Sequence, residues 1–303
     1  MRPKVSVMMI TFNHAAFVGR AIESVLSQVC PFDLELVIGD DQSTDGTLDK
    51  LHELKAGSPV PISILERPHK YGIARNWIDT FRSCRGDYIA VLEGDDYWTD
   101  SNKLVSQVNV MDQHPHWSMC FHKVLVRWED AREPDSLFPA RPILSELGIN
   151  DLIYENLIGT CSAMYRSGII STFPSGSDRL YCMDWMTHML HSIHGPIGFI
   201  DQVMGCYRRH HNGVWSGSTV HRQAIQMMQV FRVMRPLISQ AMRSRRPMMF
   251  RDVRYAEIFM GQGLRDIAFK HMVEAIKVKP WSPYLWRRLL WTMFGGIEER
   301  QSA

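Results

Sequence analysis

Several sequence signatures of common protein classes are missing from this chain of 303 residues. It has no run of about 18 apolar residues, the length that a membrane-spanning helix needs. It also has no P-loop, no zinc-ligand spacing and no nucleophile elbow, and Gly261-Gln262-Gly263 lacks the third glycine of a dinucleotide fingerprint. These absences argue against a membrane-spanning protein, a P-loop nucleotidase, a zinc protein and a dinucleotide-dependent enzyme.

Cysteine is scarce, and the start of the chain does not have the pattern of a secreted protein. The six cysteines are spread widely without a Cys-x-x-Cys pair, so we interpret them as small core residues in a reducing compartment. Met1-Arg2-Pro3-Lys4 leads directly into a strand pattern rather than into a signal peptide. We therefore expect a cytoplasmic protein.

Charge is distributed unevenly although the net charge is only +2. Up to Tyr207 the chain has 17 basic and 26 acidic residues, a net charge of −9; beyond it there are 17 basic and 6 acidic residues, a net charge of +11. The basic part carries Trp281, Trp286 and Trp291. It could face anionic lipid at the inner side of a membrane, phosphate, or an acidic surface of its own protein or of a second subunit, and these alternatives stay open.

Strand and helix patterns alternate through the first hundred residues. Apolar strand patterns at 5–10, 34–39, 61–65 and 88–92 are separated by helical spacing at 17–26, 47–54 and 74–81. Such alternation predicts an α/β fold with a mostly parallel central sheet and helices on both faces.

The remaining patterns predict a mixed region and a helical tail. We expect helices at 103–111, 147–157 and 185–192, strands at 119–126 and 162–165, two short strands within 197–207, a surface loop at 131–142, and helices from 221 onward with breaks near Pro247 and Pro280. The predicted organisation is an α/β domain over 1–217, with halves 1–100 and 101–217, followed by an α-helical region over 218–303.

The segment after the fourth strand pattern is an acid cluster, Glu93-Gly94-Asp95-Asp96. Ligands of open α/β sheets bind beyond the carboxyl ends of the strands, and clustered oxygens there suit Mg²⁺ or Mn²⁺ shared with substrate phosphates. Asp40 and Asp41 follow the second strand, so both acid clusters are expected at one edge of the sheet. The alternatives are a solvated acidic turn and, for 40–47, a loop that only caps a helix.

Other polar residues fall where they could join this crevice. Thr11, Phe12 and Asn13 end the first strand and could cradle a base or form a plain turn. Asp41 could accept a hydrogen bond from a nucleobase N–H or a ribose hydroxyl. Arg75 could pair with phosphate or with the acid cluster, or could be a solvated helix residue.

Two later segments complete the set of candidates. Asp184 lies between apolar and aromatic residues at a predicted helix start, a setting that can raise a carboxylate pKa toward that of a general base, although an Asp there is usually a cap. The run Tyr207-Arg208-Arg209-His210-His211 gathers cations and imidazoles after a strand. It could bind a diphosphate or supply a metal ligand, or the histidines could be structural.

Together these residues resemble the family 2 glycosyltransferases, inverting enzymes with the GT-A fold. The resemblance rests on 5–13, on Asp40-Asp41-Gln42-Ser43-Thr44-Asp45-Gly46-Thr47, on Ala74-Arg75-Asn76 and on Leu92-Glu93-Gly94-Asp95-Asp96-Tyr97-Trp98, and it extends through 156–162 and 183–185 to His210. The helical tail is outside it.

The resemblance implies a role for each matching residue. Asp41 would bind the base of a nucleotide-sugar, a UDP-sugar being the first candidate, and Glu93-Gly94-Asp95-Asp96 would stand for the family's Asp-x-Asp motif. Asp95 would approach the ribose or a divalent cation, Asp96 the cation, and Asp184 would be the catalytic base, with Met183 in place of the family's preceding Glu. The other residues expected to bind the donor are Thr11, Phe12, Asn13, Arg75 and Arg208, and His210 is a further expected metal ligand. The residues expected on the acceptor side are Thr160, Cys161, Ser162 and Trp185.

The predicted function is transfer of a sugar to an acceptor hydroxyl of a saccharide or a lipid-linked acceptor, in cell-surface polysaccharide or glycan synthesis. No nucleic acid is expected as a partner. Two alternatives stay open: a sugar nucleotidyltransferase, which would make rather than consume a nucleotide-sugar, and a catalytically silent nucleotide-sugar-binding protein.

Overall fold

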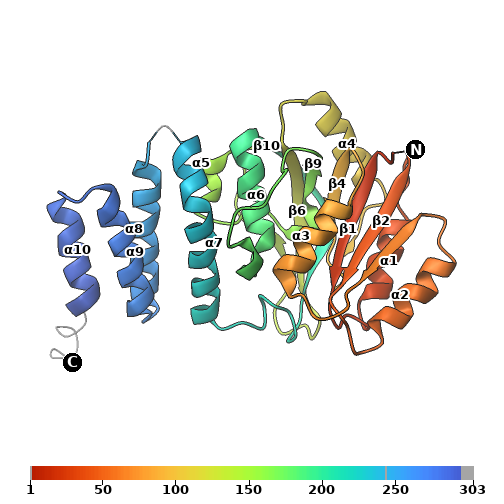
Figure 1. Cartoon of the computed structure of the whole chain (residues 1–303), viewed down its shortest axis with the longest axis horizontal. Coiled ribbons are helices and arrows are strands. Elements are labelled where there is room, and N and C mark those ends of the chain that lie inside the picture. The colour runs from red at the N-terminus through yellow and green to blue at the C-terminus, as the bar shows by residue number, and fades with distance from the viewer. Residues whose placement is uncertain (1, 243, 295–303) are drawn as a thin grey trace. The chain divides into compact units, whose positions relative to one another are not determined.

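The computed structural model describes residues 2–242 and 244–294. The chain divides into two compact units, Met1–Ser218 and Thr219–Ala303. The first unit is an α/β structure around one sheet, and the second is built from helices (Figure 1).

Four parallel strands form the first half of the sheet. They are β1 (Val5–Thr11), β2 (Leu34–Asp40), β3 (Ile62–Glu66) and β4 (Tyr88–Val91), in the order β3-β2-β1-β4. All seven residues of β1 are buried, as expected of a strand in a sheet that is covered on both faces. Thr11 is paired with Asp40, so β1 and β2 end side by side.

The second half of the sheet is mixed. β9 (Met164–Arg166) is antiparallel to both β4 and β6 (Met119–Trp128), and β10 (Ile197–Arg209) is parallel to β6. β5 (Tyr97–Trp98) pairs with β10 at the end of the sheet, while β7 (Ser136–Phe138) and β8 (Glu146–Leu147) pair with β6 and β10.

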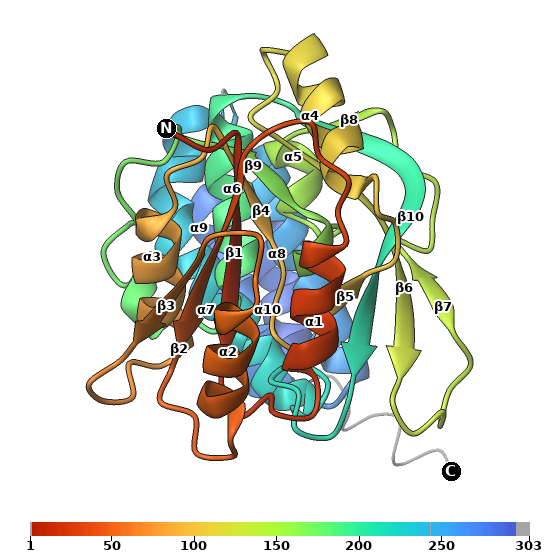
Figure 2. The ribbon, with the colours of Figure 1, turned by 90° about the vertical axis from the view of Figure 1, so that its right-hand side faces the viewer.

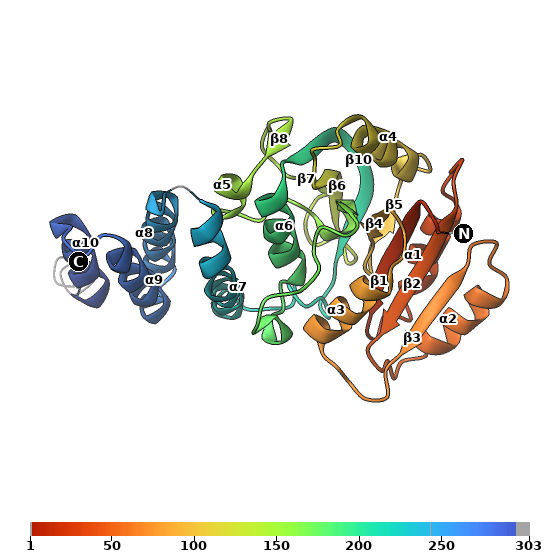
Figure 3. The same ribbon diagram turned by 45° about the horizontal axis from the view of Figure 1, so that its top comes forward.

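β10 is one long strand rather than the two short strands predicted within 197–207. Its pairing with β6 shifts register between Ile200 and Val203 and again between Val203 and Gly205. Such bulges bend a strand without ending it, and Figure 3 shows the resulting curve of β10. In the sequence this bend shows only as an interruption of the strand pattern, which is why two strands were predicted.

Helices cover both faces of the sheet. α1 (Val18–Leu26), α2 (Thr47–Ala56) and α4 (Lys103–Gln113) share one apolar core with alternate residues of β1. α3 (Ile73–Ser83) and α6 (Met183–His194) belong to the other face; Figure 2 shows α1 and α2 in front of the strands and α6 behind them. The helices on both faces confirm the α/β fold predicted from the sequence.

The helix predicted at 147–157 is much shorter in the structure. Only α5 (Ile149–Leu152) is helical there, and two short 3₁₀ turns, η1 (Thr160–Ser162) and η2 (Ser177–Arg179), follow. The carbonyl of Leu152 accepts a hydrogen bond from the Trp185 indole, and the side chain of Asn156 bonds to Asp184. After the first helical turn, tertiary contacts rather than helical hydrogen bonds therefore determine the conformation of this segment. The predicted loop at 131–142 likewise contains β7.

The second unit contains α7 (Val220–Ala241), α8 (Arg246–Gly261), α9 (Arg265–Val278) and α10 (Pro283–Phe294). Pro247 lies in the first turn of α8, where the missing N–H costs no helical hydrogen bond. Among the described helices, none combines the length and the apolar character needed to cross a bilayer.

The close approach of β1 to the turn before β4 gives a stability prediction. A Cβ on Gly86 would lie 2.4 Å from the backbone nitrogen of Ser6 and 2.8 Å from the backbone carbonyl carbon of Val5. We expect Gly86→Ala to lower the free energy of unfolding by about 1–3 kcal/mol in chemical denaturation, because the strand must shift. Gly19→Ala in α1 is the control: its Cβ meets nothing within 4 Å, so it should be neutral or stabilising. Equal stability of the two variants would contradict the packing.

Candidate active site

The site lies where β1, β2 and β4 end. The backbone N–H of Gly94 donates to the carbonyl of Ile10 at 3.0 Å, and that of Asp41 donates to the carbonyl of Thr11 at 3.0 Å. These bonds bring the segments after β2 and β4 against the end of β1. At Gly94 a Cβ would come within 2.9 Å of the His14 ring, so only glycine allows this approach. The two acid clusters therefore occupy the same edge of the sheet.

Asp95 is compensated by two imidazoles. Its Oδ2 is 3.0 Å from Nε2 of His210 and 3.7 Å from Nε2 of His14. Burial alone would raise the pKa of Asp95, but the charge of His14 and the hydrogen bond and charge of His210 outweigh it and hold the pKa below its usual value. Asp95 is thus ionised, and His210 is held against it and against the ring of Phe17, with the ring centroids 4.6 Å apart.

Asp96 is buried and only half satisfied. Its Oδ1 accepts a hydrogen bond of 2.8 Å from the backbone N–H of Arg208, while its Oδ2 is buried without a hydrogen-bond partner among the described residues. Burial, and then the charge of Asp95, raise the pKa of Asp96 well above its usual value. A buried oxygen without a partner is costly, which makes it a place for a ligand.

The guanidinium of Arg208 is near enough to Asp96 for its charge to oppose the rise in the pKa of that carboxyl. It is 5% exposed and lies 4.9 Å from the ring centroids of both Phe17 and Tyr97. Nε is 3.1 Å from the carboxylate of Glu129, and Nη2 has no hydrogen-bond partner in the described part of the chain. Arg208 therefore keeps donor capacity for an anion beside the acid cluster.

The protein ligands at this site suit a metal ion that binds together with substrate phosphates. They do not suit a metal ion held by protein side chains alone. No group of three or more His, Cys, Asp or Glu side chains in the described residues is arranged to hold a metal. Mg²⁺ is commonly bound through one or two carboxylates plus substrate phosphates and water. The free Oδ2 of Asp96 and the neighbouring Asp95 fit that pattern, whereas His210, predicted as a ligand, is bonded to Asp95.

Asp184, at the second residue of α6, lies beside the acid cluster. Its Oδ2 accepts hydrogen bonds from Nδ2 of Asn156 at 2.9 Å and from Oγ1 of Thr160 at 3.3 Å. Burial raises the pKa of Asp184, and hydrogen bonds from the Trp185 backbone, Asn156 and Thr160 moderate the rise.

Thr160 connects Asp184 to the carboxyl of Glu93. Burial raises the pKa of Glu93 well above its usual value, the charges of Asp95, Asp96 and Asp184 raise it further, and a hydrogen bond with Thr160 opposes the rise. The charges of all three other carboxylates thus affect the pKa of Glu93. Residues nearly a hundred positions apart in the sequence meet at one point.

The other residues expected on the acceptor side are mostly used in packing. Ser162 is buried and donates its hydroxyl to the carbonyl of Gly159 at 2.6 Å, and the indole of Trp185 is buried with its N–H bonded to Leu152. Cys161 is buried, and burial followed by the charge of Asp96 raises the pKa of its thiol. Of these residues, Thr160 and Cys161 present polar groups to predicted site residues: the Thr160 hydroxyl to Asp184 and the Cys161 thiol to Asp96.

On the donor side, Asp41 and Asn13 hold loops in place. The buried carboxylate of Asp41 accepts hydrogen bonds from the backbone N–H groups of Tyr71, at 2.6 Å, and Gly72, at 2.9 Å. Asn13, with φ of 56°, accepts the N–H of Thr44 at 2.9 Å. A carboxylate offers about four acceptor positions, so Asp41 retains capacity to bind a ligand N–H as well.

The remaining donor-side predictions have mixed surroundings. Thr11 is buried, and its hydroxyl has no hydrogen-bond partner among the described residues. The Lys70 ammonium lies 3.4 Å from the ring centroid of Phe12. Arg75 is exposed, lies 4.2 Å from the ring centroid of Tyr71 and pairs with Asp79. Among the described residues, neither of these contacts brings it to the acid cluster. Its donor-binding role stays a prediction.

Sequence reasoning gave no role to Asn156, Glu129 or Tyr97. Tyr97 directly follows the acid cluster, which was an available signal. Glu129 directly follows β6 and meets Arg208 because β6 and β10 run parallel. Asn156 carries no local signal for its bond to Asp184, since that contact depends on how α6 packs.

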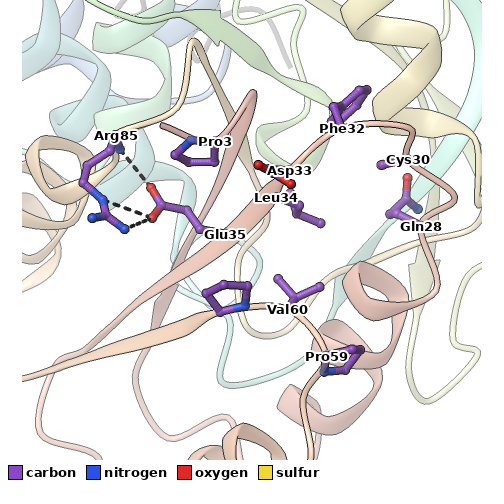
Figure 4. A pocket seen from close by; sticks show the side chains of 11 residues that line it. Pro3, Gln28, Cys30, Phe32, Asp33, Leu34, Glu35, Pro59, Val60 and Arg85 are labelled. Carbon is purple, nitrogen blue, oxygen red and sulfur yellow. Dashed lines mark hydrogen bonds and ion pairs between the residues drawn. The ribbon is translucent and has the colours of Figure 1, made fainter. Parts of the chain in front are cut away.

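The opposite edge of the sheet has a cavity of different character. It measures about 360 Å³ and is lined by residues at the starts of the strands, including Pro3, Leu34 and Glu35 (Figure 4). The Glu35 carboxylate is already bonded to Arg85 and to the hydroxyl of Ser6 at 2.6 Å. Two other charged residues line the cavity: Arg85, which is paired with Glu35, and Asp33, which is exposed. The cavity lies at the edge of the sheet away from the two acid clusters.

Comparison with known proteins agrees with this geometry. The sequence profile of Glycosyl transferase family 2 matches residues 6–173. The chain belongs to this family. An uncharacterised protein of Mycobacterium tuberculosis is 34% identical over 221 residues, which is 72% of this chain and 62% of that relative. The chain thus matches less than two thirds of that relative's length.

Two solved structures share the fold. The Staphylococcus aureus protein TarS (residues 1–349), in complex with UDP-GlcNAc, is 16% identical, with a TM-score of 0.59 over 95% of this chain and 79% of that structure. The mannosyltransferase PcManGT of Pyrobaculum calidifontis, in complex with GDP-Man and Mn²⁺, is 16% identical, with a TM-score of 0.61 over 98% and 88%. This structural likeness confirms the GT-A fold that the sequence predicted, and the helices α7 to α10 confirm the predicted C-terminal helical region.

The raised pKa of Asp184 gives a prediction for stability against pH. A carboxyl whose pKa is higher in the folded chain than in the unfolded chain makes folding less favourable as pH rises through that interval. We expect Asp184→Asn to raise the thermal unfolding midpoint at neutral pH, with the gain disappearing below the usual carboxyl pKa, where both side chains are neutral. Asp178→Asn, at an exposed position, is the matched control without a gain. A lower midpoint for Asp184→Asn at neutral pH would contradict this environment.

Proposed function

We propose that the protein transfers a sugar from a nucleoside diphosphate sugar to an acceptor hydroxyl, with inversion at the anomeric carbon. A UDP-sugar is the first candidate donor, and the acceptor is a saccharide or a lipid-linked saccharide in cell-surface polysaccharide or glycan assembly. The single observation that carries the proposal is the contact of Thr160 with both Asp184 and Glu93, which brings a candidate base to the acid cluster. The nucleotide-sugars bound by the two structural neighbours support the donor class.

Asp184 is the proposed catalytic base. The acceptor oxygen attacks the anomeric carbon as the bond from that carbon to the diphosphate oxygen breaks, and the acceptor proton passes to the Asp184 carboxylate. Burial raises the pKa of Asp184 and so makes it a stronger base than an exposed aspartate. Asn156 and Thr160 both donate to Oδ2, so Oδ1 is the oxygen proposed to receive the proton.

The leaving diphosphate would lie between Asp96 and Arg208. Nη2 of Arg208 has no other partner among the described residues, so it can donate to a phosphate oxygen. The residues that would hold a divalent cation are Asp96 and Asp95, with His210 next to them. When bound, Mg²⁺ or Mn²⁺ would neutralise the charge that develops on the diphosphate.

The neighbouring groups limit the negative charge that the donor meets. The raised pKa of Glu93, caused first by burial and then by the three nearby carboxylates, lets it hold a proton where an ordinary glutamate is ionised. The two imidazoles near Asp95 offset that carboxylate. The donor base and ribose would contact Thr11, Phe12, Asn13, Asp41 and Asp95, with Arg75 at the outer side.

The base assignment is tested by separating binding from transfer. A thermal-shift screen of nucleoside diphosphates with and without Mn²⁺ identifies the donor base, because a ligand of the native state raises apparent stability by mass action. With the matching donor, we expect Asp184→Asn to keep the nucleotide-induced shift but to lose about a hundredfold to ten-thousandfold in transfer rate. Unchanged transfer would exclude Asp184 as the base.

Asp96→Asn is the complementary variant. It removes the charge of the only predicted metal ligand with a free buried oxygen, so we expect the Mn²⁺-dependent part of the nucleotide shift to disappear while the metal-independent part remains. Asp178→Asn should leave both parts unchanged. A full Mn²⁺-dependent shift in Asp96→Asn would remove Asp96 from the cation site.

A further inference from the structure

The last described helix exposes a continuous set of large apolar side chains. Trp281, just before α10, is 91% exposed, and Leu290 within it is 54% exposed. We use the name aromatic face for the exposed residues Trp281, Tyr284, Trp286, Leu290, Trp291 and Met293. Scattered apolar residues are normal on a protein surface, but a set gathered on one helix marks an interaction surface.

The aromatic face is opposite the side of α10 that packs in the second unit. Leu285, Leu289 and Thr292 recur at helical spacing and are buried, the two leucines within the core shared by α8 and α9. Trp286, Leu290 and Met293 recur at the same spacing on the exposed side. One apolar stripe of α10 therefore packs against the second unit, and a second apolar stripe remains exposed.

The segment that carries the aromatic face has charges of one sign only. From Lys279 to Phe294 the sequence contains no Asp or Glu and three basic residues. Arg288 is paired with Glu257, whereas Arg287 and Lys279 are exposed and have no ion-pair partner in the described part of the chain. By helical spacing, Arg287 lies among Tyr284, Leu290 and Trp291 on the exposed side. An anionic surface complements this arrangement.

We propose that the aromatic face docks on an anionic lipid bilayer, with α10 lying in the interface. Tryptophan and tyrosine rings are favoured at the headgroup level, and arginine and lysine beside them are attracted to anionic lipid. A second copy of this chain fits less well, because a two-fold contact through the face would bring Arg287 toward its own counterpart. The inference depends only on the second unit and is independent of the proposed sugar transfer.

The test is co-sedimentation of the full chain with phosphatidylcholine vesicles, with and without phosphatidylserine. Binding is expected with phosphatidylserine, accompanied by a blue shift of tryptophan emission, and it should weaken as salt is added. The variant Trp281→Ser/Leu290→Ser should lose at least about tenfold in partitioning, because two exposed apolar side chains no longer enter the interface. Both residues are outside the core, so the variant should keep the wild-type unfolding midpoint.

Phe250→Ser is the matched control, since Phe250 is a 57% exposed aromatic residue on α8, away from the aromatic face in the sequence. It should bind vesicles as the wild-type chain does. Arg287→Glu should weaken binding only when phosphatidylserine is present. Absence of binding to phosphatidylserine vesicles, equal loss in Phe250→Ser, or concentration-dependent self-association that the double variant abolishes would each overturn the proposal.

Discussion

The structure of the first unit depends on crowding four carboxyl groups into a buried space at the end of a sheet. Glu93, Asp95, Asp96 and Asp184 influence one another, and burial disfavours the charge on each of them. Such repulsion is tolerable only where positive groups or protons offset it. The histidines and arginine around the cluster therefore belong to the site as much as the acids do.

The chain's own positive groups offset the negative charge of Asp95 and of Asp96 unequally. This difference indicates what kind of ligand the site would bind. Asp95 is offset by two imidazoles, and its pKa is lowered, whereas Asp96 has a raised pKa and a buried oxygen that meets no hydrogen-bond partner within 2–242 and 244–294. Arg208 in turn keeps an unused donor. An acid with one free oxygen and a cation with one free donor group, close together, are what a site needs to receive a metal ion and a phosphate together. The site gives up stability in the empty protein for binding, a common feature of functional sites.

The sequence predicted the parts of the site that local pattern controls. Strand patterns that Thr11, Asp40 and Glu93 directly follow predicted convergence, because parallel strands end at one edge. The fold confirms the sheet with helices on both faces. It could not predict that His210 binds Asp95 or that Asp41 binds the amides at Tyr71 and Gly72, because those contacts need tertiary structure. The helix predicted at 147–157 was too long for the same reason, because tertiary contacts end it. The assignment of residues 1–100 to the nucleotide-sugar and of residues 101–217 to the acceptor stays a prediction.

The stereochemistry of the reaction tests the central claim most directly. With the nucleoside diphosphate sugar selected by the binding screen, proton NMR can follow the first sugar that the enzyme releases to water or transfers to an acceptor, before any free sugar equilibrates between its anomers. A single displacement assisted by Asp184 predicts an anomeric configuration opposite to that of the donor. A product with the donor's configuration would contradict the account, because it would require a covalent or front-side route in which Asp184 does not act as the base.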